Sequence, residues 1–133
     1  MVSARERLTL LSTIALLGTI PVSTGILGIV GGPEKAPGGG PTTASVDSEY
    51  RFVNVFWSAA GGLLWWTLRQ PEQRLIATRA VLGLAALGGL PRLLSVRRVG
   101  LPHPIFRATI VVELLVVPLV LIWHSRVFPR GRH

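Results

Sequence analysis

The stretch LTLLSTIALLGTIPVSTGILGIV, residues 8–30, is 23 residues long and carries no charge. As an α-helix it would be about 35 Å long, which is enough to cross a bilayer with some tilt. Pro21 lies inside it, and we expect a kink rather than an end there. The alternative is a secretory signal peptide behind Arg5 and Arg7, but the apolar core of a signal is typically only about 7 to 15 residues long. We therefore predict a transmembrane helix.

Three more apolar segments follow, at about residues 52–68, 75–96 and 105–123. The polar turn between the first two of these, RQPEQR at residues 69–74, is so short that the helices on either side must be antiparallel neighbours. Pro91 interrupts the third span, and we expect the helix to continue past it with a kink. The predicted fold class is an all-α bundle of four transmembrane helices in up-down order. The whole chain, residues 1–133, forms a single membrane domain.

Residues 31–49 connect the first two spans and are rich in glycine and proline. We expect an outer loop, because this composition favours neither helix nor strand. The triplet Gly38-Gly39-Gly40 does not resemble a phosphate-binding loop, since no Lys-Ser/Thr pair follows it and no strand precedes it.

The chain has 14 basic and 6 acidic residues, and only 15% of its residues are charged. Four spans place both termini on one side, and seven bases in short segments fall on that side, which the positive-inside rule identifies as the cytoplasm. These bases are Arg5, Arg7, Arg69, Arg74, Arg126, Arg130 and Arg132. Arg97 and Arg98, in the second outer connector, oppose this orientation. We expect Arg69, Arg74 and Arg126 to be cytoplasmic anchors, and Arg79 to snorkel to the membrane surface or contact lipid phosphates.

An ionisable residue inside a membrane is costly, which makes Glu113 a candidate site residue. It lies eight residues into the last span, close to the expected midplane. Arg92 on the third span is at a similar depth, so we predict a buried Arg92–Glu113 pair. Arg51 and Asn54 share one face of the second span and are expected to join the pair, with His103 capping the cluster from the outer connector. The cluster either fixes helix register or binds a lipid head group or another anion.

The sequence lacks the residue patterns of the common classes of enzyme. Without cysteine the chain has no thiolate nucleophile and no cysteine-ligated metal. His103 and His124 lie at opposite ends of the last span, so they do not face each other across a haem. No catalytic triad or pair of carboxylates is evident. We expect no enzyme activity, no cofactor, no metal, and no nucleic-acid binding, because the arginines flank apolar spans rather than line a polar groove.

Four ordered motifs resemble those of a known family. They are Ser48-Glu49-Tyr50-Arg51-Phe52, the GGLPRLLS stretch at residues 88–95, the GLPHP turn at residues 100–104, and a following span that contains Glu113. Together they are similar to a family of small bacterial four-helix membrane proteins known only by a domain of unknown function. The resemblance covers about residues 8–125 and implies the fold but no activity. This sequence departs from the family pattern at Pro91, where a small residue is more usual.

From these features we expect a multi-pass protein of the bacterial inner membrane with both termini in the cytoplasm. Our first hypothesis for its role is a non-enzymatic accessory or stabilising subunit of a larger complex, such as a lipid-transport or export assembly. The alternative is an independent binder or carrier of a lipid or a small hydrophobic or anionic molecule. Such a binder could act as a homo-oligomer. Membrane lipid is an expected partner under both hypotheses, and other membrane-protein subunits are expected under the first.

Overall fold

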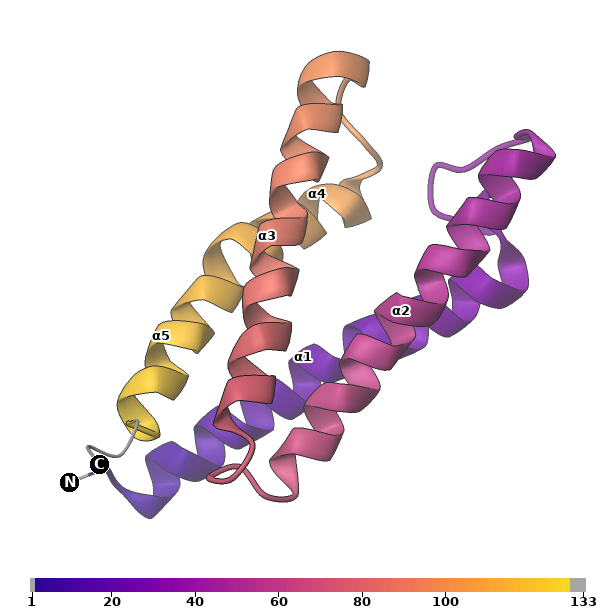
Figure 1. The fold of residues 1–133 in the computed structure, drawn as a ribbon. Coiled ribbons are helices and arrows are strands. Elements are labelled where there is room, and N and C mark those ends of the chain that lie inside the picture. The colour runs from indigo at the N-terminus through magenta and orange to yellow at the C-terminus, as the bar shows by residue number, and fades with distance from the viewer. Residues whose placement is uncertain (1, 130–133) are drawn as a thin grey trace.

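The computed structural model describes residues 2–129, which form helices and connecting segments without strands. The order is α1 (Ala4–Gly31), the short 3₁₀ helix η1 (Pro33–Lys35), α2 (Ala44–Leu68), α3 (Leu75–Val99), α4 (Pro104–Val111), η2 (Val112–Val116) and α5 (Val117–Val127). The last three run on without a break, so the described chain contains four long helical rods (Figure 1). The expected all-α class is confirmed.

Three of the rods are long and apolar enough to cross a membrane: α1, α3 and the joined helix Pro104–Val127. Large apolar side chains point outward along them, among them Leu27, Leu84 and Leu119, each more than 60% exposed. Soluble proteins rarely expose apolar surface on this scale. The chain is therefore a membrane protein. Although α2 is 25 residues long, it is not among the three, and its crossing remains a prediction.

Local signals explain the starts of the first two long helices. The Ser3 hydroxyl accepts a hydrogen bond from the Glu6 amide, which caps α1, and Thr43 caps α2 in the same way through Val46. Because of the Thr43 cap, α2 begins at Ala44, so residues 44–49 are helical and the predicted outer loop is shorter than expected. As predicted, α3 continues through Pro91, and it ends at Val99.

η2 is a turn of π-helix inside the last rod. Pro118 lies four residues after Leu114 and has no N–H to donate to the Leu114 carbonyl, while its ring crowds that carbonyl. A local widening of the helix relieves this conflict, and π turns are a common form of such widening. Glu113 lies within this turn.

The rods form two antiparallel hairpins, α1 with α2 and α3 with the last rod (Figure 1). The hairpins pack together at the end that holds the described termini, and they diverge toward the other end. The buried apolar core lies in the packed half. It consists of Leu10, Ile14, Leu64, Val81, Leu82, Val117, Val120, Val127 and Phe128.

Candidate functional site

The structure brings Arg92 and Glu113 together, at the place where the hairpins diverge. Arg92 Nε lies 2.9 Å from Glu113 Oε2. The Arg92 guanidinium also lies 5.8 Å from the centre of the Phe106 ring on α4. The pair therefore joins α3 to η2 within the second hairpin.

Burial of this pair is asymmetric. Glu113 is only 4% exposed, whereas the Arg92 side chain is 36% exposed. Glu113 Oε2 has no hydrogen bond of good geometry among residues 2–129, although Arg92 Nε lies close to it. The contact is thus electrostatic, and the remaining guanidinium N–H groups are left available for other acceptors.

A glycine allows η2 to approach α3 at this point. A Cβ on Gly89 would lie 2.6 Å from side-chain atoms of Leu114 and 3.3 Å from the Glu113 Cβ, so a larger residue would push the two elements apart. Gly89 therefore fixes the distance across which Arg92 and Glu113 meet.

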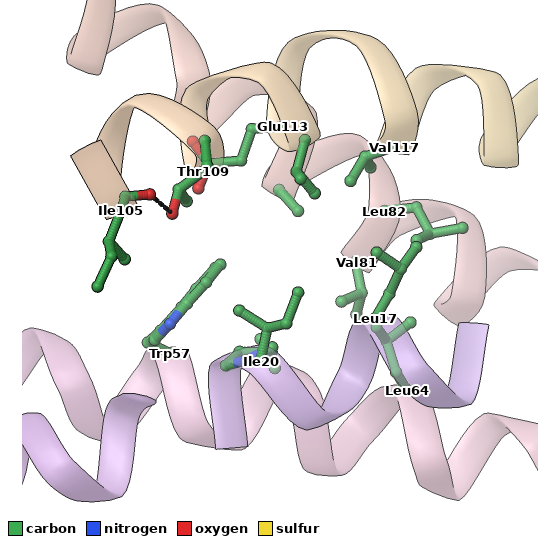
Figure 2. Close-up of a pocket in the computed structure, with 15 residues that line it drawn as sticks. Leu17, Ile20, Trp57, Leu64, Val81, Leu82, Ile105, Thr109, Glu113 and Val117 are labelled. Carbon is green, nitrogen blue, oxygen red and sulfur yellow. Dashed lines mark hydrogen bonds between the residues drawn. The ribbon is translucent and has the colours of Figure 1, made fainter. Parts of the chain in front are cut away.

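Beside the ion pair lies an apolar cavity of about 290 Å³ between the two hairpins (Figure 2). All four rods contribute to it, with Ile20 and Trp57 on one wall and Thr109 and Glu113 on the other. The Trp57 indole N–H donates to Thr24 Oγ1 at 2.9 Å, which satisfies its polar group away from the cavity. Among residues 2–129, Glu113 is the one charged residue in the lining.

A second groove, of about 530 Å³, opens between α2 and α3 and includes both Arg92 and Glu113. The two hollows share five lining residues, Trp57, Ala60, Val81, Ala85 and Glu113, so they are parts of one cleft. Exposed apolar side chains such as Phe56 and Leu84 border the groove. The groove therefore opens sideways between helices.

The divergent ends of the hairpins meet again through their loops. Gly38, at a positive φ of 73°, lies against His103, so a Cβ on Gly38 would come within 3.1 Å of the His103 Cβ. His103 also caps α4, because its Nδ1 accepts a hydrogen bond from the Ile105 amide at 3.3 Å. The two hairpins are therefore linked by this loop contact at one end and by the apolar core at the other, with the cleft between these links.

Arg51 and Asn54 do not join the ion pair, which corrects the predicted cluster. Arg51 pairs with Asp47 at 2.8 Å and donates to the Ile29 carbonyl at 2.6 Å, at the end of α1. Asn54 donates to the Tyr50 carbonyl and its side chain lies against α1. The face of α2 that carries them packs on α1, because α1 has unpaired carbonyls at its C-terminal end for Arg51 to bind.

The Asp47–Arg51 pair was missed by sequence reasoning, although its spacing of four residues within one helix is a usable signal. The hydrogen bond from Arg51 lowers the pKa of Asp47 below its ordinary value. Both side chains lie in the first two turns of α2, outside the predicted apolar span. Their role is to fasten the start of α2 to the end of α1.

The arginines at the end of the molecule that holds the described termini make different contacts. Arg69 and Arg126 are exposed, and Arg74 stacks on Trp66 with its guanidinium 3.6 Å from the ring centre. Arg79 differs from the expectation of a snorkelling anchor: it donates to His124 Nδ1 at 3.4 Å and to the Phe128 carbonyl, and so fastens the end of α5. Arg130 and Arg132 lie outside the described residues.

Comparison with known proteins gives a family and no activity. No curated protein and no solved structure matches the chain. A family model described as a domain of unknown function, DUF4345, matches residues 10–124, which include both hairpins and the ion pair. The chain therefore belongs to the DUF4345 family, as its sequence motifs suggested.

Proposed function

We propose that this protein binds a hydrophobic molecule taken from the bilayer, in the cleft between its two helix hairpins. The observation that carries the proposal is the cavity of about 290 Å³, lined by apolar side chains of all four rods and by the carboxylate of Glu113. Ligand pockets are typically apolar with a few placed polar groups, and of about 300 Å³ or more. This role is non-enzymatic and corresponds to the binder or carrier hypothesis from the sequence.

The groove between α2 and α3 favours a ligand that enters from the membrane rather than from water. The groove is bordered by exposed apolar residues of α2 and α3, which in a bilayer face acyl chains. The Gly38–His103 contact joins the loops at the divergent ends of the two hairpins. The apolar border of the groove favours a lipid-like molecule that enters between α2 and α3.

The proposed topology is four membrane crossings in the bacterial inner membrane, with both termini in the cytoplasm. Two contacts between the ends of the described chain support an even number of crossings: Trp123 donates to Glu6 at 3.3 Å, and Arg7 lies 5.0 Å from the Phe128 ring centre. Because α2 packs along α1 through Gly18, Gly25 and Gly61, it must share the environment of α1. We therefore propose α2 as the fourth span.

The test is purification of the full chain in mild detergent, followed by native mass spectrometry of what stays bound. We expect a retained hydrophobic molecule with the unaltered chain and its loss in Ala85→Phe, which fills a position shared by both hollows. Ala80→Phe on the exposed face of α3 is the matched control and should retain it. Equal retention by both variants, or no bound molecule in the unaltered chain, would refute the proposal.

The accessory-subunit hypothesis remains a prediction, and the same purification tests it. Stoichiometric recovery of another membrane protein, unaffected by Ala85→Phe, would favour a subunit role over a binding role. A partner lost together with the cleft would mean that a helix of that partner, rather than a free molecule, occupies it.

A further inference from the structure

The charge around the cleft is strongly uneven, and it lies on the second hairpin. Between residues 92 and 113 the sequence has four arginines, Arg92, Arg97, Arg98 and Arg107, and one acid, Glu113. The facing end of the first hairpin is close to neutral, with Glu34, Asp47 and Glu49 against Lys35 and Arg51. The divergent end of the second hairpin is therefore basic, and Arg92 places part of this charge in the groove.

This positive charge is on the side opposite to the one that the positive-inside rule favours, if the termini are cytoplasmic. The bases at the chain termini and in the 69–74 turn suffice to orient the protein, so Arg97, Arg98 and Arg107 oppose its insertion without contributing to it. Their side chains are exposed. A surface kept basic against the topological signal is suited to attract anions.

Arg92 is the member of this group that reaches the cleft. It lines the groove between α2 and α3, it is partly exposed, and its recorded partners among residues 2–129 are the Glu113 carboxylate and the Phe106 ring. Arginine has five N–H donors, and the short contact of the Arg92 Nε with Glu113 engages at most one of them. Guanidinium groups bind carboxylates and phosphates through paired hydrogen bonds.

The apolar cavity continues directly from this guanidinium. Glu113 borders both hollows, so a ligand head group at Arg92 would lead into the space between Ile20, Trp57 and Val117. At about 290 Å³ this cavity is at the lower end of the size range for ligand pockets, roughly 300 to 1,000 Å³. This cavity holds part of one acyl chain, and the groove that shares its lining holds the rest of that chain beside Arg92.

We infer that the ligand of the cleft is a single-chain amphiphile with an anionic head group, whose head binds Arg92 and whose chain fills the cavity beside Trp57. This inference rests on the proposed function and names the class of its ligand. The shared chemistry is an anion at the end of one apolar chain, and both a fatty acid and a lysophospholipid provide it. When no ligand is bound, the Glu113 carboxylate pairs with Arg92 and holds its guanidinium in position.

Trp57 provides a reporter for the test. In the full chain, Trp65, Trp66 and Trp123 are changed to Phe, which leaves Trp57 as the single tryptophan. Dibromostearic acid is then added to the protein in detergent, because bromine atoms on its chain quench a tryptophan that they touch. The matched neutral probe is dibromostearyl alcohol, and a brominated lysophosphatidic acid distinguishes a phosphate head from a carboxylate.

We expect saturable quenching by the two anionic probes and at least tenfold weaker binding of the alcohol. Arg92→Gln should weaken the anionic probes by about tenfold to a hundredfold and leave the alcohol unchanged. Arg126→Gln, which removes an exposed arginine at the other end of the molecule, should change the binding of all three probes by less than about twofold. If Arg92→Gln folds poorly, two other variants take its place in the same comparison. They are Arg92→Lys and the double variant Arg92→Gln with Glu113→Gln.

The outcomes separate the two proposals. Equal binding of acid and alcohol that Arg92→Gln does not alter would overturn the anionic head group and leave a hydrophobic binding cleft. Quenching that never saturates with any probe, and that Ala85→Phe does not reduce, would overturn the binding cleft itself. A brominated phosphatidic acid serves as the two-chain anionic probe, and tighter binding of this lipid than of both single-chain anions would overturn the single-chain assignment.

Discussion

Gly25 of α1 packs directly against Ser58 of α2, with no space for a side chain between the two helices. A Cβ on Gly25 would overlap Ser58 Oγ and lie 2.9 Å from two backbone atoms of α2, the Asn54 carbonyl oxygen and the Ser58 nitrogen. Backbone atoms do not move aside as a flexible side chain does. This contact therefore sets how closely the first hairpin closes.

Gly25→Ala should lower the free energy of unfolding by about 1–3 kcal/mol, because it forces the two helices apart. Gly83→Ala is the matched control, since a Cβ there meets open space, and it should be neutral or stabilising by up to about 1 kcal/mol. Thermal or denaturant unfolding in detergent measures both. Equal stability of the two variants would contradict the close packing of α1 and α2.

The Arg92–Glu113 pair should reveal itself in a double-mutant cycle. Arg92→Gln and Glu113→Gln should each destabilise by about 1–3 kcal/mol, less than a fully buried pair because Arg92 is partly exposed. The double variant should cost less than the sum by roughly 0.5 kcal/mol or more, since neither group is then left unpaired. Strict additivity would show that the two side chains do not interact.

Arg79 should hold the last turn of α5 in place. Arg79→Gln removes the donor to the Phe128 carbonyl and to His124, a residue only 1% exposed, and should cost about 1–3 kcal/mol. Faster hydrogen exchange or proteolysis at the end of α5 would report the loss. Arg126→Gln changes an exposed arginine of the same end and should fall within about 0.5 kcal/mol of the unaltered chain.

Asp47 should make the junction of α1 and α2 sensitive to acid. Its pKa is lowered by the hydrogen bond from Arg51, so its contribution to stability is present above the ordinary carboxyl pKa of 3.8 and is lost as the pH falls through the folded-state value. The melting temperature of the unaltered chain should therefore fall more steeply below pH 4 than that of Asp47→Asn. Parallel profiles for the two proteins would contradict this role.

Membrane orientation can be tested directly because the chain lacks cysteine. Single cysteines replace Ala44, at the start of α2, and Gln70, in the turn before α3. A membrane-impermeant thiol reagent added to intact cells should label Ala44→Cys and spare Gln70→Cys. The reverse pattern would invert the proposed topology, and labelling of both positions would exclude a crossing by α2.

The sequence predicts the helices well because long segments without charge indicate helices that can span a membrane. α3 continues through Pro91 as predicted, and the contact between Arg92 and Glu113 follows from their similar depth in two adjacent spans. The start of α2 is harder to predict from the sequence, because residues 44–51 are helical but polar and therefore do not look like part of a membrane span. The Thr43 cap and the Asp47–Arg51 spacing were the available clues.

Side-chain partners across the molecule are harder to predict than helices. Arg51 binds carbonyl groups of Ile29 and Val30, more than twenty residues away, and nothing in its local sequence identifies them. The assignment of Arg51 to the Glu113 cluster assumed one bundle in which every polar face meets the others. Two diverging hairpins instead give each polar face its own partner, and the cleft that results has no signature in the sequence.

The π turn at Val112–Val116 also determines how the last rod could change during evolution. Such a turn holds one more residue than an α-helical turn, so it takes up an extra residue while the faces of α4 and α5 stay nearly in register. Deleting one residue there would restore a regular helix with little rotation, whereas a deletion elsewhere in the rod would turn one half against the other by about 100°. The π turn is therefore the place where the length of this rod could change while Phe106 and Thr109 keep their positions.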